Sequence, residues 1–198
     1  MYGIFQLPRA IDHTFTDYIW WMPGYVRRGE FDRFLVRPIN PFFQLIAQKL
    51  DYNALGELAI GIGAISYAMT RLGVVITPIT ALVMLTYILF GALIYTAVKL
   101  LFGTVSFYTM VAFPIMSASY SMSNYAQYPL TIYPGWLKKV LHYFLPFAFT
   151  AYYPTLYLLG ENSSLWPLVG CIVVAIVSFT IAYGFFRYSL SKYQSAGS

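Results

Sequence analysis

Long apolar stretches divided by short polar segments dominate this sequence. Four of them contain no Asp, Glu, Lys or Arg, at residues 72–98, 100–137, 140–160 and 162–186. Each is at least as long as the roughly 20 residues that cross a bilayer as an α-helix. The pattern predicts an all-α membrane protein, built as a polytopic helical bundle.

Within this pattern we expect about four full transmembrane helices, at residues 58–76, 78–99, 104–122 and 165–186. In the first helix, Ala59/Gly63 and Ala64/Ala68 have the small-residue spacing that lets helices approach closely in lipid. In the third helix, Pro114 predicts a kink, because proline lacks the N–H that an α-helix needs. The helices are therefore expected to pack together as one bundle.

A charged segment precedes these helices. Residues 26–38 hold six charged side chains, in a chain with only 12 Lys and Arg and 7 Asp and Glu. After Gly29, the hydrophobic residues Phe31, Phe34 and Leu35 follow the i, i+3, i+4 spacing of an amphipathic helix. We predict a short helix from Glu30 to Arg37, which Pro38 ends.

A second amphipathic helix is predicted directly after the charged segment. Asn40 is a favourable N-cap, and Pro41 follows it at the first helical position. Through Leu50, the polar residues Gln44, Gln48 and Lys49 then lie among hydrophobic residues. Together the two short helices make residues 26–54 a candidate surface for contacts in water.

Residues 124–160 combine four prolines with seven tyrosines and one tryptophan, which is unusual for a straight transmembrane helix. Lys and Arg concentrate on the cytoplasmic side of membrane proteins, so residues 27–37 and 187–192 should both be cytoplasmic. That placement requires an even number of crossings between them. Because residues 140–159 would be a fifth crossing, and Pro146 and Pro154 interrupt them, we predict an external re-entrant helical hairpin there.

The chain is expected to form a single transmembrane domain over residues 1–198. Residues 1–25 resemble the end of a preceding span and an aromatic interfacial segment, residues 26–54 form the cytoplasmic segment, and residues 55–198 form the membrane bundle. The abrupt apolar start predicts an N-terminally incomplete copy of a longer protein.

The amino-acid composition is also typical of a protein embedded in a lipid bilayer. Hydrophobic residues make up 59% of the chain and charged residues 10%, and the mean hydropathy is +0.63. The net charge of +5 does not indicate nucleic acid, because the basic residues occur in ones and twos without an aromatic-interleaved patch. Cys171 is the single cysteine, so the chain itself offers neither a disulfide nor a thiolate metal site.

No catalytic motif and no cofactor site is apparent in the sequence. The two histidines, His13 and His142, are far apart, and the chain has neither a phosphate-binding Gly-rich loop nor a Gly-x-Ser-x-Gly motif. Asp12, His13 and Asp17 are the one cluster that resembles a catalytic set, and we interpret them as polar residues at a span end. The chain is therefore not expected to be an enzyme.

Ionisable residues near the predicted helices have structural explanations. Glu57 opens the first full helix, where a carboxylate is favourable beside the helix N-terminus. The middle of every predicted helix is uncharged. Because ion-coupled carriers place ionisable residues at mid-membrane, this argues against coupling to protons or sodium.

The charged segment resembles a motif of ABC transporter permeases of the ABC-2 type, the exporter class. These permeases tend to carry, between their second and third spans, an Arg-rich stretch followed by Gly, an acidic or Thr position, a hydrophobe, an acid and an apolar run that ends in Pro. Here the motif reads Arg27-Arg28-Gly29-Glu30-Phe31-Asp32-Arg33-Phe34-Leu35-Val36-Arg37-Pro38. The continuation through Phe43 and the C-terminal end are similar to a bacterial subfamily described only as ABC-2 family permeases.

The resemblance implies the membrane-spanning permease subunit of an ATP-driven ABC exporter. Its partners would be cytoplasmic ABC ATPase subunits and a second permease subunit, in a homodimer or heterodimer, within the bacterial cytoplasmic membrane. ATP hydrolysis would belong to the ATPase subunits. The short helix would be a coupling helix that docks in a groove of the ATPase. The implied coupling residues are Glu30, Phe31, Asp32, Arg33, Phe34, Leu35, Arg37 and Pro38.

Two alternatives remain open on the sequence alone. The charged segment also fits an ordinary positive-inside loop that fixes topology and contacts nothing. The whole chain also fits an ATPase-independent membrane carrier or scaffold protein. The sequence does not identify a transported substrate, since helices lined with Gly, Ala, Tyr and Phe suit lipids, drugs, peptides and sugars alike.

Overall fold

The computed structural model describes residues 1–74, 76–109, 112–160 and 164–193, and all regular secondary structure in these ranges is helical. The elements are α1 (Tyr2–Thr16), η1 (Asp17–Trp21), α2 (Met22–Arg27), α3 (Asp32–Leu35), α4 (Pro41–Ile46), α5 (Ala54–Leu72), α6 (Pro78–Thr104), η2 (Val105–Phe107), α7 (Ala112–Ser121), η3 (Met122–Gln127), η4 (Leu130–Ile132), α8 (Gly135–Lys139), the π-helix η5 (Val140–Phe144), α9 (Ala148–Leu158) and α10 (Trp166–Lys192). The all-α prediction is confirmed.

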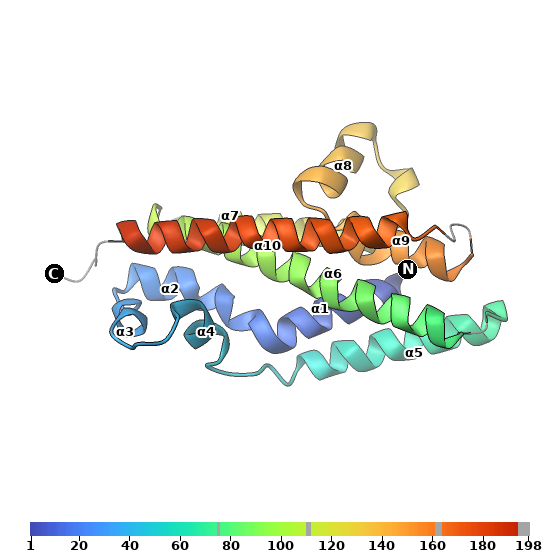
Figure 1. The fold of residues 1–198 in the computed structure, drawn as a ribbon, viewed down its shortest axis with the longest axis horizontal. Coiled ribbons are helices and arrows are strands. Elements are labelled where there is room, and N and C mark those ends of the chain that lie inside the picture. The colour runs from blue at the N-terminus through green and yellow to red at the C-terminus, as the bar shows by residue number, and fades with distance from the viewer. Residues whose placement is uncertain (75, 110–111, 161–163, 194–198) are drawn as a thin grey trace.

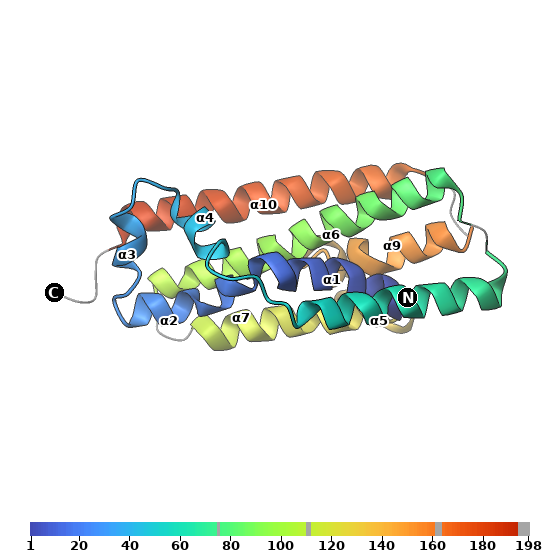
Figure 2. The same ribbon diagram turned by 90° about the horizontal axis from the view of Figure 1, so that it is seen from below.

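The helices form an elongated bundle around α6. Helix α6 packs against α10 on one side and against α1 on the other, and α1 also packs against α5. Figures 1 and 2 show α2, α3 and α4 gathered at one end of the bundle, beside the last turns of α10. We call this end the α3 end. It contains the whole charged segment.

Two helices among the described residues are long and apolar enough to cross a membrane, namely α6 extended through η2 (Pro78–Phe107) and α10 (Trp166–Lys192). Both correspond to predicted transmembrane helices. Helix α5, with 19 residues, matches a third and ends at Gly73. Helix α10 also continues through residues 187–192, beyond the predicted end of the last helix at residue 186.

The predicted helix at residues 104–122 is not a single full span. Thr104 is the last residue of α6, and η2 continues that helix through Phe107. Helix α7 begins at Ala112 and has 10 residues, which is about 15 Å of helix and half of a bilayer. Pro114 lies in its first turn, where a missing N–H costs little, so it does not kink the middle of a span.

Residues 140–159 are also divided, at Pro146 as predicted, whereas Pro154 does not interrupt its helix. The π-helix η5 ends at Phe144, and α9 follows with 11 residues and Pro154 inside it. Before them, η4 and α8 form a projection that Figure 1 shows standing away from the bundle near α9 and α10. We call η4, α8 and η5 the hairpin.

Close packing between α1 and α5 depends on two glycines. A Cβ built on Gly61 would lie 2.8 Å from Leu7 Cδ2 and 3.2 Å from the Gly3 carbonyl oxygen. A Cβ on Gly3 would lie 2.9 Å from the Gly61 carbonyl oxygen. Gly63, by contrast, has open space around it. The small-residue prediction therefore holds for the helix, but the contact face is centred on Gly61 and Ala64, whereas the predicted Ala59/Gly63 pair is exposed.

Replacing Gly61 by Ile is expected to push α1 and α5 apart. Overpacking of a tight contact typically costs about 1–3 kcal/mol, and here the backbone of Gly3 cannot move aside as a side chain could. The matched control is Gly63→Ile, which adds the same side chain two residues away in open space. Thermal unfolding in detergent should show a lower midpoint for Gly61→Ile only. Equal midpoints for the two variants would contradict this packing.

Candidate functional site

The charged segment begins with a tight turn in front of a single helical turn. Gly29 has φ +69°, a left-handed conformation that glycine adopts without strain. The turn lets the Phe31 N–H donate to the Tyr25 carbonyl oxygen at 3.2 Å. Helix α3 then spans Asp32–Leu35, which is shorter than the predicted helix from Glu30 to Arg37. The remaining predicted positions belong to the turns on either side.

The aromatic residues of the predicted apolar stripe point into the protein. Phe31 is 0% exposed and Phe34 is 2% exposed. The Phe31 ring lies 5.1 Å from the ring of Phe107 in η2 and 5.9 Å from that of Tyr193, which follows α10. Phe31 and Phe34 therefore cannot dock in a partner's groove. The expectation of a Phe31, Phe34 and Leu35 docking face is wrong for the two phenylalanines, because the hydrophobic effect buries their rings within this chain.

Helix α4 fixes the other end of the segment to α10. As predicted, Asn40 caps it, with its side-chain oxygen accepting from the Phe42 N–H at 3.0 Å. The Asn40 side-chain amide donates to the Tyr183 hydroxyl. The Phe42 ring also packs against Tyr183 and Phe186 at centroid separations of 5.8 and 6.3 Å. The segment is thus bound to the end of α6 through Phe31 and to α10 through α4.

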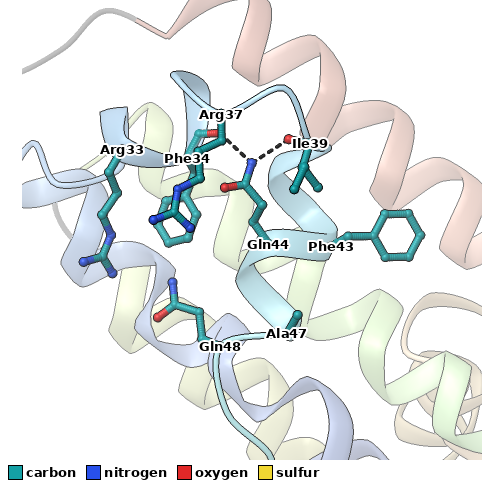
Figure 3. A pocket seen from close by; sticks show the side chains of 8 residues that line it. All are labelled: Arg33, Phe34, Arg37, Ile39, Phe43, Gln44, Ala47 and Gln48. Carbon is teal, nitrogen blue, oxygen red and sulfur yellow. Dashed lines mark hydrogen bonds between the residues drawn. The ribbon is translucent and has the colours of Figure 1, made fainter.

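The opposite face of the segment is exposed and apolar. Val36 is 84% exposed, and Leu35, Ile39 and Phe43 are exposed as well. Beside them lies a pocket of about 550 Å³, shown in Figure 3, whose lining residues are Arg33, Phe34, Arg37, Ile39, Phe43, Gln44, Ala47 and Gln48. We call Leu35, Val36, Ile39, Phe43 and this pocket the outer face.

Hydrogen bonds from Gln44 hold the pocket in shape. Its side-chain amide donates to the Phe34 carbonyl oxygen at 2.8 Å and to the Ile39 carbonyl oxygen at 2.5 Å (Figure 3). The two charged lining residues, Arg33 and Arg37, are both positive, and the Arg33 guanidinium lies 4.6 Å from the centroid of the Tyr25 ring. The pocket therefore suits an acidic group.

The remaining predicted coupling residues lie on the rim of the outer face or on its flank. Glu30 is exposed and accepts from Arg28 at 2.8 and 3.1 Å, and this bidentate pair lowers the pKa of the Glu30 carboxyl. Asp32 is partly exposed. Burial of the Tyr193 ring, and then the nearby charge of Asp32, raise the pKa of the Tyr193 hydroxyl. Pro38 is exposed between Arg37 and Ile39.

A second polar site lies inside the bundle. Lys99 of α6 and Asp12 of α1 are both 0% exposed in their side chains, and the Lys99 ammonium nitrogen lies 2.8 Å from Asp12 Oδ2. Asp12 also accepts from the hydroxyls of Thr16, Thr96 and Tyr120 at 2.6, 2.9 and 3.0 Å. The carboxylate is thus fully paired, as a buried charge requires.

This ion pair continues as a hydrogen-bonded chain toward the surface. The Tyr120 hydroxyl lies 2.9 Å from His13 Nε2, and His13 Nδ1 lies 3.1 Å from Glu57 Oε2. The Tyr120 hydroxyl also lies 3.0 Å from Asp12 Oδ2, so this one hydroxyl links the imidazole ring to the buried carboxylate. Asp12, Tyr120, His13 and Glu57 therefore form one connected polar chain.

These contacts correct two sequence interpretations. Asp12 and His13 are not simply polar residues at a span end, and Lys99 does not end the second helix but lies within it. The interpretation of Glu57 is confirmed, because it lies in the first turn of α5, and its carboxylate also contacts the His13 side chain. Charge is therefore present inside the bundle, as a neutralised pair. Among the described residues no group of three or more His, Cys, Asp or Glu side chains is arranged to hold a metal ion.

Two helices long and apolar enough to cross a membrane lie in one bundle with a buried ion pair, and an exposed charged segment lies at one end, as in a polytopic membrane protein. The model of the ABC-2 family transporter proteins matches residues 1–197. The chain belongs to this family, whose members are membrane subunits of ABC transporters that generally work with separate ATPase subunits. No curated protein and no solved structure gives a significant match.

Proposed function

We propose that this chain is the membrane-spanning permease subunit of an ATP-driven ABC exporter. In this proposal the α3 end is cytoplasmic and its outer face contacts an ATPase subunit. A second permease subunit, identical or similar, completes the transporter in the bacterial cytoplasmic membrane. The hairpin and α9 then lie toward the external side as the re-entrant element, α5, α6 and α10 are full crossings, and α7 through α9 together return the chain to the external side, so the number of crossings stays even.

One observation carries the proposal, namely the two-sided construction of the charged segment. Its inner side packs on Phe107 after α6 through Phe31, and α4, which directly follows the segment, packs on Tyr183 and Phe186 of α10 through Phe42. Its outer face leaves Val36 and Ile39 exposed to water beside the basic pocket. A positive-inside loop does not need such a face. A force applied to the outer face would reach α6 and α10 directly, because buried aromatic contacts transmit displacement better than a flexible loop does.

The chemistry of the outer face fits a helical groove on a partner. The exposed apolar residues would supply the buried contact, and Arg33 and Arg37 would select an acidic rim and fix the register. The coupling residues therefore change from the sequence prediction. Leu35, Val36, Arg37 and Ile39 would contact the ATPase, whereas Phe31 and Phe34 would anchor the segment to the permease.

Co-purification tests the proposal. The permease, expressed with a cognate ABC ATPase and extracted in mild detergent, should retain that ATPase, and the complex should hydrolyse ATP. Transport into inverted vesicles should require ATP and should cease with a non-hydrolysable analogue. Loss of the ATPase under all mild conditions, or transport without ATP, would refute the proposal.

An ATPase-independent carrier is the second candidate, and the buried chain from Glu57 through His13 and Tyr120 to Asp12 is the observation that favours it. Ionisable chains of this kind mark proton paths in carriers. The two candidates differ in energy source. Vesicles with an imposed pH gradient and no ATP should transport only if the chain is a carrier, and replacing His13 with Gln should then abolish that transport.

A further inference from the structure

The hairpin carries a basic pocket whose chemistry does not depend on ATP coupling. Leucines fix the hairpin to the core around α6 and α9, and the buried ones are Leu130, Leu137, Leu141 and Leu145. Other hydrophobic side chains point outward, with Trp136 66%, Tyr143 78% and Phe144 71% exposed. The hairpin is therefore firmly attached but presents aromatic surface to its surroundings, as residues at a membrane interface do.

The pocket holds positive charge, and no acidic side chain is among the described residues that line it. It has a volume of about 400 Å³, and its lining residues are Leu130, Thr131, Lys138, Lys139, His142, Tyr143, Tyr152 and Tyr153. No Asp or Glu occurs in residues 124–160. Neither lysine has an ion-pair partner within the ranges that the structure describes. Two adjacent ammonium groups in one concavity favour an anion such as a phosphate.

An apolar trough adjoins this basic pocket. It has a volume of about 330 Å³ and runs between α6, the end of η5 and α10, where Val98, Phe144, Val173 and Val177 are among the lining residues. No charged side chain lines it. Tyr143 lines both the trough and the basic pocket, so the two hollows are neighbours on either side of this ring. Two α10 residues that line the trough are also exposed, Val173 to 53% and Val177 to 49%.

We infer that the basic pocket and the trough together bind one anionic phospholipid. Lys138 and Lys139 would hold the phosphate of the headgroup, the Tyr143 ring would cover the glycerol region, and an acyl chain would lie in the trough along Val177. The charge complementarity selects an anionic headgroup, and the uncharged trough selects an amphiphile over a free anion. The exposed α10 face lets such a ligand enter sideways from the bilayer.

Native mass spectrometry of the full purified chain tests this site. The probes are phosphatidylglycerol and phosphatidylcholine with identical acyl chains. The wild-type chain should bind phosphatidylglycerol more tightly, and the double variant K138Q/K139Q should weaken that binding about thirtyfold, as expected for two basic groups near an anionic headgroup. The matched control K49Q/K192Q removes two exposed lysines elsewhere and should leave binding unchanged. Equal binding of both lipids by the wild-type chain, or no effect of K138Q/K139Q, would overturn the proposal.

A second pair of variants tests the acyl-chain part independently. Val177→Trp fills the trough, whereas Val169→Trp places the same side chain on the same helix at similar exposure, outside the trough. Only Val177→Trp should weaken phosphatidylglycerol binding, by at least threefold. Inorganic phosphate at millimolar concentration should not displace the lipid. Full displacement by phosphate, or equal binding by the two variants, would identify a free-anion site instead and refute the lipid assignment.

Discussion

Asp12→Asn is expected to be the most destabilising conservative substitution in this chain. The substitution removes the negative charge but keeps the size of the side chain, so Lys99 stays buried. Its nearest remaining carboxylate is then Asp17, whose Oδ1 lies 3.9 Å from the Lys99 nitrogen. Breaking one partner of a buried ion pair typically costs about 3–5 kcal/mol. Chemical unfolding in mixed micelles should therefore show a free energy of unfolding about 3–5 kcal/mol lower than that of the wild-type chain.

The double variant Asp12→Asn/Lys99→Met separates the charge from the packing. It removes both buried charges, and replacing a buried pair by uncharged groups is often close to neutral. Most of the lost stability should therefore return, and the double-mutant cycle should give a coupling energy at least as large as the loss from Asp12→Asn alone, about 3 kcal/mol or more. Lys192→Met, at an exposed lysine, is the control and should change stability by less than about 0.5 kcal/mol. Additive losses in the double variant would show that the pair does not act as a unit.

The buried pair also shows where sequence reasoning reached its limit. Asp12 and Lys99 lie 87 positions apart, and each stands at the edge of an apolar run, where it resembles an ordinary helix boundary. One signal was present, since Lys99 alone separates two long charge-free stretches. A lone ionisable residue in such a place is costly in a bilayer unless paired, so a partner could have been sought. Which partner pairs with it depends on tertiary packing.

Local features of the charged segment were predictable because they depend on neighbouring residues. Asn40 before Pro41 specified the start of α4, and Gly29 before Phe31 specified the turn. The orientation of the aromatic residues was not predictable. Phe31 and Leu35 share one face in an i, i+4 pattern, but Phe31 is buried against Phe107 while Leu35 is exposed. Periodicity identifies an apolar face, and it does not tell whether the chain itself or a partner covers that face.

The boundary between α6 and α7 illustrates the same limit in the membrane region. Residues 100–137 carry no charge, so nothing in the pattern marks where one helix ends and another begins. The sequence prediction began a new helix at residue 104, whereas the structure ends α6 there and begins α7 at Ala112. Helix boundaries were therefore predictable where a charged residue or a proline marks them, as at Pro78. They were not predictable within a long stretch that has no charged residue.

Val36→Asp is expected to abolish transport while leaving the permease folded. Val36 is 84% exposed on the outer face, so a carboxylate there costs the permease little but places an unpaired charge in the proposed apolar contact with the ATPase. The complex should keep at least half of its ATP hydrolysis, because the ATPase chemistry lies in the partner, and should lose tenfold or more of ATP-dependent transport in vesicles. Ser191→Asp adds the same charge at an exposed position of the α3 end outside the outer face, and should transport normally.

Phe34→Asp distinguishes uncoupling from unfolding, because Phe34 is 2% exposed and packs against Tyr25 at a centroid distance of 5.5 Å. A buried, unpaired carboxylate there should lower the thermal midpoint and the yield, which Val36→Asp should leave unchanged. If both variants lost transport with equal loss of stability, the outer face would have no role of its own. If Val36→Asp transported normally with full ATP hydrolysis, the contact with the ATPase would have to lie elsewhere. The expected pattern, in which only the buried variant loses stability and the exposed one loses transport, would assign anchoring to the inner side of the segment and coupling to the outer face.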